Sequence, residues 1–242
     1  MNAVRSRVDG QRAYVLHAYP YSETSQIVDV FSRGHGRLPL LARGARRPRS
    51  SLRGILQGFQ PLELAWFGAG EVKTLAKAEW CGGLPPLQGK ALFVGYYLNE
   101  LLMKLLPRED AHDRLFDAYE EALRALVQRA GDAATLRRFE TALLRELGYG
   151  LVLDREAGSG NPVEAGHDYV FVIERGAIPA AAAAEDGQAR ISGRTLLDMA
   201  ADRYEEARTL AESKQLMRRL LTHYLGGQLL QSRKVFMELP ET

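Results

Sequence analysis

The amino-acid sequence predicts an α+β fold, in which a small barrel of five strands is followed by an all-helical C-terminal domain. Residues 11–80 contain five short runs that are apolar or alternate between apolar and polar residues, as strands do. After Leu84-Pro85-Pro86-Leu87 the apolar residues recur with the spacing of helices instead. We therefore assign residues 1–82 to the barrel domain and residues 83–242 to the helical domain.

The predicted strands follow one another closely, with turn residues between them. Pro20-Tyr21-Ser22 ends the first strand, and Gly68-Ala69-Gly70 forms the turn before the last one. The strands are expected at residues 13–16, 26–31, 37–42, 59–67 and 72–78. Five short strands within about 70 residues match the OB-fold, a small barrel that commonly binds oligonucleotides.

Apolar stripes and end signals predict the helices of the second domain. Pro107 ends a long helix with a broad apolar face, and Asp132 is suited to cap a later helix that Gly148 terminates. The helices are expected at residues 92–106, 115–126, 133–147, 192–204 and 210–225. A region at about 151–192 interrupts them. It contains a polar loop at 154–168, a short strand at 169–173, and a helix or loop at 180–184.

Composition is that of an ordinary globular protein, with 46% apolar and 26% charged residues among 242. No apolar run approaches the roughly 20 residues that a membrane helix needs. The only cysteine, Cys81, excludes an internal disulfide and a multi-cysteine metal site. The five histidines are too scattered for a helical metal pair. We therefore expect no metal, no cofactor and no membrane segment.

Basic residues are concentrated near the N-terminus. The net charge is only +2, yet residues 1–80 carry twelve Lys and Arg against six Asp and Glu. Residues 33–53 hold seven arginines and no acid. Arginine forms bidentate hydrogen bonds to phosphate, so this segment favours a nucleic-acid backbone as ligand. The alternative is a solvated charged loop. The predicted DNA-binding residues are Arg33, Arg37, Arg43, Arg46, Arg47, Arg49, Arg53, Lys73 and Lys77.

Motifs of catalysis are absent from the sequence. Gly68-Ala69-Gly70 and Gly158-Ser159-Gly160 each begin like a dinucleotide-binding loop but lack its third glycine. There is no Walker loop and no Gly-x-Ser-x-Gly elbow. A binding protein is therefore favoured over an enzyme. The alternatives are a DNA-processing enzyme, a sequence-specific DNA-binding regulator and a purely structural adaptor.

A series of short motifs, in order along nearly the whole chain, resembles the RecO family of bacterial recombination and repair mediators. In the first domain these are Tyr21-Ser22-Glu23-Thr24-Ser25, Ala42-Arg43-Gly44-Ala45-Arg46, Ser50-Ser51-Leu52-Arg53-Gly54 and Gly70-Glu71-Val72-Lys73-Thr74-Leu75. In the second they are Tyr97-Leu98-Asn99-Glu100-Leu101-Leu102, Leu136-Arg137-Arg138-Phe139-Glu140, Leu147-Gly148-Tyr149-Gly150 and Tyr224-Leu225-Gly226-Gly227.

The resemblance implies a protein that binds single- and double-stranded DNA and anneals complementary strands without ATP. It implies as partners the C-terminal tail of the single-stranded DNA-binding protein, RecR and, indirectly, RecA, in the bacterial cytoplasm at the nucleoid. Many members of the family carry a four-cysteine zinc site after the Leu-Gly-Tyr turn. The corresponding loop, residues 154–168, has no cysteine here, so the chain resembles a metal-free branch.

For the tail of the single-stranded DNA-binding protein we expect a site in the helical domain. A tail that ends in an aromatic residue and a carboxylate needs an apolar pocket beside a guanidinium. Arg137 is the favoured guanidinium. The residues expected at this site are Arg137, Arg138, Phe139, Leu143, Tyr97 and Leu101.

Overall fold

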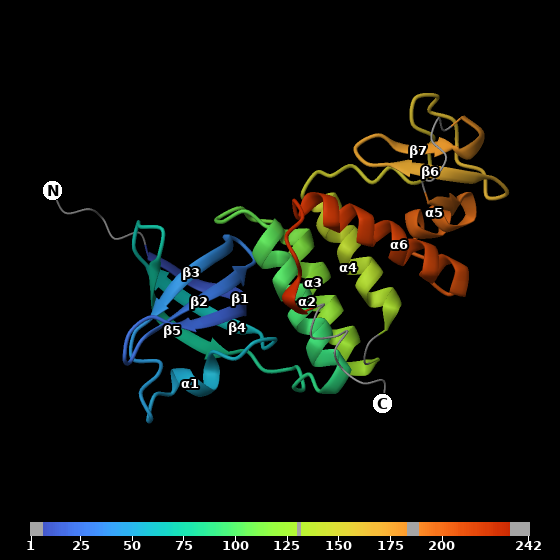
Figure 1. Cartoon of the computed structure of the whole chain (residues 1–242). Coiled ribbons are helices and arrows are strands. Elements are labelled where there is room, and N and C mark those ends of the chain that lie inside the picture. Colours follow the sequence, from blue (N-terminus) through green and yellow to red (C-terminus); the bar gives the residue numbers. More distant parts are fainter. Residues whose placement is uncertain (1–6, 130–131, 183–188, 233–242) are drawn as a thin grey trace. The chain divides into compact units, whose positions relative to one another are not determined.

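The structure, a computed structural model, describes residues 7–129, 132–182 and 189–232 (Figure 1). The chain forms two compact units. The first unit comprises residues 1–131 together with 230–242, and the second comprises residues 132–229.

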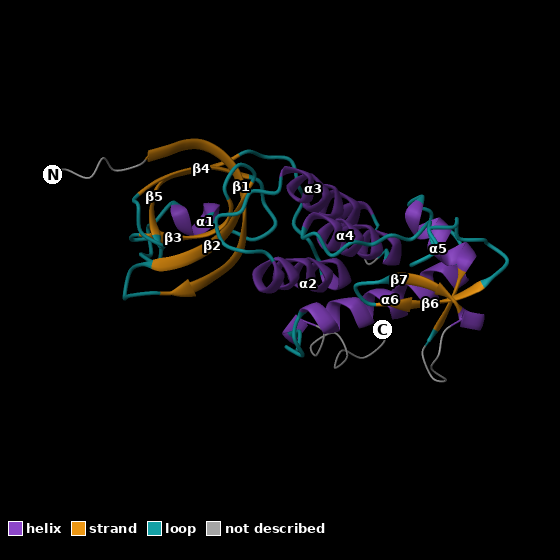
Figure 2. Ribbon diagram, turned by 90° about the horizontal axis from the view of Figure 1, so that it is seen from above, coloured by secondary structure: helices purple, strands orange, loops and turns teal. Residues whose placement is uncertain are grey.

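Five strands of the first unit close into a barrel in the order β1-β2-β3-β5-β4 (Figure 2). β3 and β5 pair in parallel and the other neighbours are antiparallel. Their bounds are β1 Arg7–Pro20, β2 Gln26–Ser32, β3 Gly36–Ala42, β4 Leu62–Phe67 and β5 Lys73–Trp80. The five predicted strands and the OB-fold class are therefore confirmed.

A four-residue helix that was not predicted, α1 Leu52–Ile55, lies between β3 and β4. It covers one end of the barrel, where Leu52 and Ile55 pack against the core (Figures 1 and 2). The barrel core is formed by alternate residues of the strands, among them Val28, Val30 and Trp66, each at most 1% exposed. Burial of these side chains is the main contribution to the stability of the barrel.

Two helices of the first unit cover the outside of the barrel. They are α2 Gly89–Leu105 and α3 Asp113–Gln128. Phe31 points out of the barrel and packs against Phe116 and Tyr119, with ring centroids 5.3 and 6.1 Å away. Successive side chains of β2 therefore pack alternately in the barrel core and against the helices. Both faces of this strand are buried.

Buried polar groups join these helices to β1. The Asn99 side chain on α2 donates to the Leu16 carbonyl at 2.8 Å and accepts from the Tyr119 hydroxyl at 2.6 Å. Glu120 on α3 accepts from the Tyr14 hydroxyl at 2.7 Å and from Arg12. Burial and the hydrogen bond to Glu120 raise the pKa of Tyr14 well above its ordinary value. Because buried polar groups must be paired, these bonds fix the helices on the barrel.

The described residues of the second unit form three further α-helices and a small sheet. Asp132 caps the first helix as predicted, accepting from the Ala134 amide at 3.1 Å. The elements are α4 Ala133–Glu146, β6 Asp168–Val172, β7 Gly176–Pro179, η1 Ala180–Ala182, β8 Arg190–Ser192, α5 Gly193–Ala200 and α6 Ala207–Tyr224. The structure thus adds a three-stranded sheet, in the order β7-β6-β8, to a domain expected to be entirely helical. α5 ends at Ala200, four residues earlier than predicted.

Hydrogen bonds hold the polar loop 154–168 in a defined course. Val163 donates to the Asp154 carbonyl at 2.9 Å, and the Glu164 amide donates to the Tyr169 hydroxyl at 2.9 Å. Within residues 7–129, 132–182 and 189–232, no three His, Cys, Asp or Glu side chains gather in a way that could hold a metal ion. None of the described helices is long and apolar enough to cross a membrane.

Candidate nucleic-acid interface

Five of the predicted DNA-binding arginines lie on one segment, which we call the arginine loop: residues 43–53, which begin directly after β3 and end within α1. Its basic side chains are Arg43, Arg46, Arg47, Arg49 and Arg53, and all five residues are exposed. None of them forms an ion pair with a carboxylate in the part of the chain that the structure describes. Their positive charge therefore remains available to an anionic ligand.

Backbone hydrogen bonds give the arginine loop a defined course. Arg47 donates to the Gly44 carbonyl at 3.1 Å and Ser50 donates to the Arg47 carbonyl at 3.0 Å, which makes two consecutive turns. Gly44 adopts a φ of +70°, a conformation that favours glycine. Ala45 is 1% exposed and packs in the barrel core, which anchors the loop while its arginines face solvent.

The arginine loop is also tied to the loop between β1 and β2, residues 21–25. The Arg46 amide donates to the Thr24 carbonyl at 2.9 Å. The Arg46 guanidinium donates to the Ser22 carbonyl at 2.6 Å. The β1–β2 loop is one of the two loops with which OB-folds commonly bind oligonucleotides.

Sequence reasoning missed an aromatic residue at this place. Tyr21, next to Ser22, is 64% exposed and is the first residue of the β1–β2 loop. An exposed ring beside arginines that have no carboxylate partner is the kind of surface on which proteins stack bases while guanidinium groups hold phosphates. In the sequence Tyr21 stands within a predicted turn. Turn residues are expected to be exposed, and this expectation could have marked Tyr21 as a candidate.

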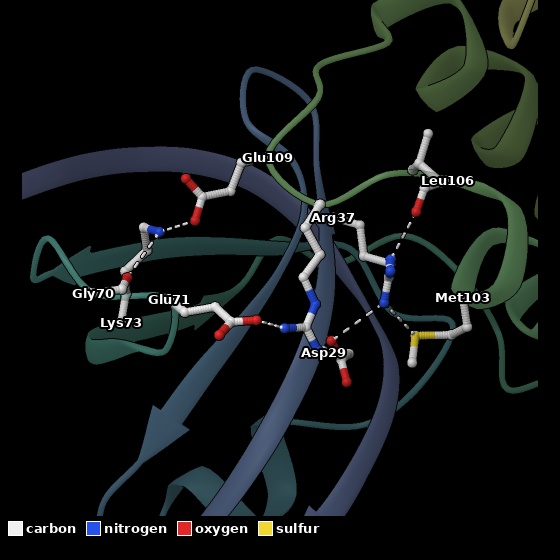
Figure 3. Close-up of polar contacts among 9 residues, drawn as sticks. Asp29, Arg37, Gly70, Glu71, Lys73, Met103, Leu106 and Glu109 are labelled. Atoms are coloured by element: carbon white, nitrogen blue, oxygen red, sulfur yellow. Dashed lines mark hydrogen bonds and ion pairs between the residues drawn. The ribbon is translucent and has the colours of Figure 1, made fainter.

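Two predicted arginines outside the arginine loop serve the contact between barrel and helices. Arg33 forms a bidentate pair with Asp117, at 2.7 and 2.9 Å, and lies over the Phe116 ring. Arg37 donates to the Leu106 carbonyl at 3.1 Å and lies 3.8 Å from Asp29 (Figure 3). Burial lowers the pKa of Arg37, although Asp29 opposes this effect.

The two predicted lysines also have acidic partners. Lys73 pairs with Glu109 and donates to the Gly70 carbonyl at 3.2 Å (Figure 3). Lys77 pairs with Glu79 at 2.8 Å on the barrel surface. These carboxylates reduce the attraction of both lysines for phosphate. DNA contact remains a prediction for all nine residues. The prediction is best supported for the arginine loop, whose arginines have no carboxylate partner among the described residues.

The residues predicted to hold a partner's tail fall into both compact units. Tyr97 and Leu101 belong to α2 in the first unit, whereas Arg137, Arg138, Phe139 and Leu143 belong to α4 in the second. Arg137 is 8% exposed and pairs with Glu140 at 2.9 Å. Arg138 is more exposed, binds Asp202 at 2.8 Å and lies over the Tyr204 ring. The role of these residues stays a prediction.

Comparison with known proteins identifies the family. The model of "Recombination protein O N terminal" matches residues 9–84, and that of "Recombination protein O C terminal" matches residues 86–235. The DNA repair protein RecO of Aromatoleum aromaticum is 55% identical over 237 residues, covering 98% of both chains. The DNA repair protein RecO of Nitrosospira multiformis is 48% identical over 241 residues, covering all of both chains. The chain thus belongs to the RecO family of DNA repair and recombination proteins.

Proposed function

We propose that this protein is a recombination mediator that binds single- and double-stranded DNA through the arginine loop and anneals complementary strands without ATP. With RecR, it helps load RecA onto strands coated by the single-stranded DNA-binding protein. It acts as a binding protein rather than an enzyme, in the bacterial cytoplasm at the nucleoid. Family membership supports the role in DNA repair, and the five exposed arginines without a carboxylate partner in the described part of the chain support the mode of binding.

The charge arrangement of the barrel accounts for binding that does not depend on base sequence. Guanidinium groups neutralise backbone phosphates and release counterions, and this contribution is the same for every sequence. Tyr21 adds a stacking surface that tolerates any base. By contrast, a sequence-specific regulator needs polar side chains that reach base edges from an exposed helix. The arginines of α4 do not provide such side chains, because Arg137 is buried and Arg138 is paired with Asp202.

Annealing without nucleotide hydrolysis follows from the same physics. Two strands repel each other through their phosphates, and a basic surface that holds one strand lowers the cost of bringing up the second. Base pairing then supplies the free energy. The protein only has to remove the electrostatic barrier and to release the duplex.

A strand-annealing assay, with and without the coating protein, tests the proposal. The double variant Arg46→Ala/Arg47→Ala should anneal more slowly than the parent protein in both conditions. The control is Arg175→Ala/Arg208→Ala, which removes the same charge from exposed positions of the second unit. Equal rates for the two double variants would refute a specific role of the arginine loop.

A further inference from the structure

A hollow of about 320 Å³ opens in the first unit between the residues that follow α1 and the beginning of α2. Gln57, Phe59 and Gln60 line one side, and Leu87 and Tyr96 line the other. The volume lies at the lower end of the roughly 300–1,000 Å³ found for small-ligand sites. Neither the arginine loop nor the β1–β2 loop contributes a lining residue, so the hollow is a separate feature.

One exposed aromatic ring lines this hollow, a second is bonded to a lining residue, and both are held in place. Tyr96 is 53% exposed, and its ring stands on that of buried Phe59, with centroids 5.2 Å apart and planes at 74°. Trp80 is 60% exposed, and its indole Nε1 donates to the Gln60 side-chain oxygen at 3.1 Å. Exposed rings with a fixed orientation lose little conformational entropy when a planar ligand stacks on them.

Phe59, which lines the hollow, has a strained backbone conformation. Phe59 adopts a φ of +66°, which is unfavourable for a residue with a side chain. Its ring lies so close to α2 that a Cβ on Gly95 would stand 2.8 Å from both Phe59 and Leu87. Strained residues persist where the surrounding structure holds them, and they are concentrated at ligand sites.

The chemistry of the lining fits an uncharged planar ligand with hydrogen-bonding edges. None of the residues that line the hollow is charged. Gln57 is exposed, and its amide both donates and accepts. Gln60 uses its oxygen on Trp80, which leaves its NH₂ group to donate. Aromatic faces beside free amide groups are the means by which proteins hold unstacked nucleobases.

The arginine loop leads directly to this hollow along the chain. Arg53 lies on α1, which ends at Ile55, and the lining begins at Gln57. A strand whose phosphates are held by the arginine loop would therefore have a neighbouring base within reach of the hollow. This continuity favours a base over the aromatic side chain of a partner protein.

We infer that this hollow binds an unstacked base of single-stranded DNA, stacked on Tyr96 with Trp80 close by, while the arginine loop holds the backbone. The inference rests on the proposed function, because it takes the arginine loop as the phosphate site. The bases of an intact duplex are already stacked on one another and cannot enter. The hollow would thus give the protein a preference for single strands that the arginines alone cannot provide.

Equilibrium binding by three variants and three probes tests this inference on the full-length protein. The probes are a short oligothymidine, an abasic strand of equal length and a duplex. Tyr96→Ala should weaken oligothymidine binding by roughly 5- to 150-fold, the range expected for one stacked base. It should leave abasic-strand and duplex binding unchanged, because these probes offer no free base. Tyr96→Phe keeps the ring and should bind like the parent protein.

Tryptophan fluorescence provides a second readout. The chain has two tryptophans: Trp66 is 1% exposed in the barrel core, whereas Trp80 is 60% exposed and bonded to Gln60, which lines the hollow. Oligothymidine should quench the emission of the parent protein, and the quenching should vanish in Trp80→Phe. Quenching by an acidic, aromatic peptide instead of oligothymidine would assign the hollow to a protein partner and overturn the inference.

The variants also separate the inference from the proposed function. Arg46→Ala/Arg47→Ala should weaken the binding of all three probes, whereas Tyr96→Ala should act on oligothymidine alone. If only the arginine variant has an effect, the base site is refuted and the phosphate site stands. If Tyr96→Ala weakens all three probes equally, Tyr96 has no role specific to bases, and the inference fails.

Discussion

The Arg46 guanidinium donates a hydrogen bond to the carbonyl oxygen of Ser22, at 2.6 Å. This bond joins the loop after β3 to the loop between β1 and β2, and the two bonded residues are 24 positions apart in the sequence. Because the acceptor is a neutral carbonyl, the charge of Arg46 is not cancelled. The bond therefore positions a guanidinium beside exposed Tyr21 without weakening its attraction for phosphate.

DNA binding by Arg46→Ala/Arg47→Ala should depend less steeply on salt than binding by the parent protein. Each lost phosphate contact lowers the slope of log K against log salt by about 0.7–0.9. The affinity should fall similarly for unrelated sequences, because phosphate contacts carry no sequence information. Fluorescence anisotropy at several salt concentrations measures both quantities. An unchanged slope and affinity would contradict the assignment of these arginines.

Gly36→Ala should destabilise the protein because Gly36 combines a left-handed backbone with a close neighbour. Its φ is +64°, and an added Cβ would collide with the backbone of Asp110. The loop there is clamped by Arg37 and by the pair Lys73–Glu109 (Figure 3). We expect a loss of about 1–3 kcal/mol in the free energy of unfolding.

Gly10→Ala is the matched control for that experiment. Gly10 has a φ of +63°, yet nothing lies within 4 Å of a Cβ built on it. Its substitution should therefore cost only the backbone strain, about 1 kcal/mol. Chemical denaturation of both variants measures the difference. Equal losses would show that the approach of Asp110 to Gly36 does not contribute.

The barrel and most helices could be predicted from the sequence because their apolar residues recur with a clear period. The stripe of Leu115, Tyr119 and Leu126 is buried on α3 as expected. The four-residue α1 and the short strands β7 and β8 could not be predicted, since so few residues show no period.

The grouping of the basic side chains could not be predicted either. Arg33 and Arg47 look alike in the sequence, but Arg33 meets Asp117, which lies 84 residues further along the chain. Only the packing of α3 on the barrel brings these two residues together. Such long-range ion pairs separate the arginines that serve the fold from those that remain available for a ligand.

Glu100 should make the stability of the first unit depend on pH in the acid range. Burial raises the pKa of Glu100, but hydrogen bonds from the Ser232 hydroxyl and amide and from the Gln231 amide outweigh it, so that the pKa is lowered. A lowered pKa in the folded state stabilises the protein above the ordinary carboxyl pKa of 4.5. This stabilisation should be lost as the pH falls below that value.

Glu100→Gln provides the measurement for the pH prediction. The variant should be less stable than the parent protein at neutral pH, and the difference should shrink as the pH is lowered from about 5 to 3. Thermal unfolding across this range shows the trend. A constant difference between the two proteins would exclude a titration of Glu100 as the cause.

The purified, tag-free protein should contain much less than one zinc ion per chain. A closed structural zinc site needs four ligands, and loop 154–168 provides no cysteine. Hydrogen bonds such as that from the Glu164 amide to the Tyr169 hydroxyl hold this loop instead. Elemental analysis measures the metal content directly. About one zinc per chain, retained after dialysis against a chelator, would contradict this prediction.

The acidic, apolar C-terminal tail of the single-stranded DNA-binding protein should bind to the helical domain through Arg137 or its neighbour Arg138. Arg137→Glu should weaken binding of a fluorescent tail peptide severely and leave binding to naked DNA nearly intact. Arg137 pairs with Glu140 at 2.9 Å in the parent protein. Because Arg137→Glu would replace this pair by two adjacent carboxylates, it should also destabilise the fold.

Arg138→Glu supplies the second variant, because Arg138 is exposed and its partner Asp202 lies at the surface. This change should cost little stability, since exposed ion pairs contribute only about 0–1 kcal/mol. It should nevertheless reduce tail binding, because a carboxylate would then repel the acidic peptide. If the peptide binds both variants as tightly as the parent protein while circular dichroism shows them folded, the tail docks elsewhere.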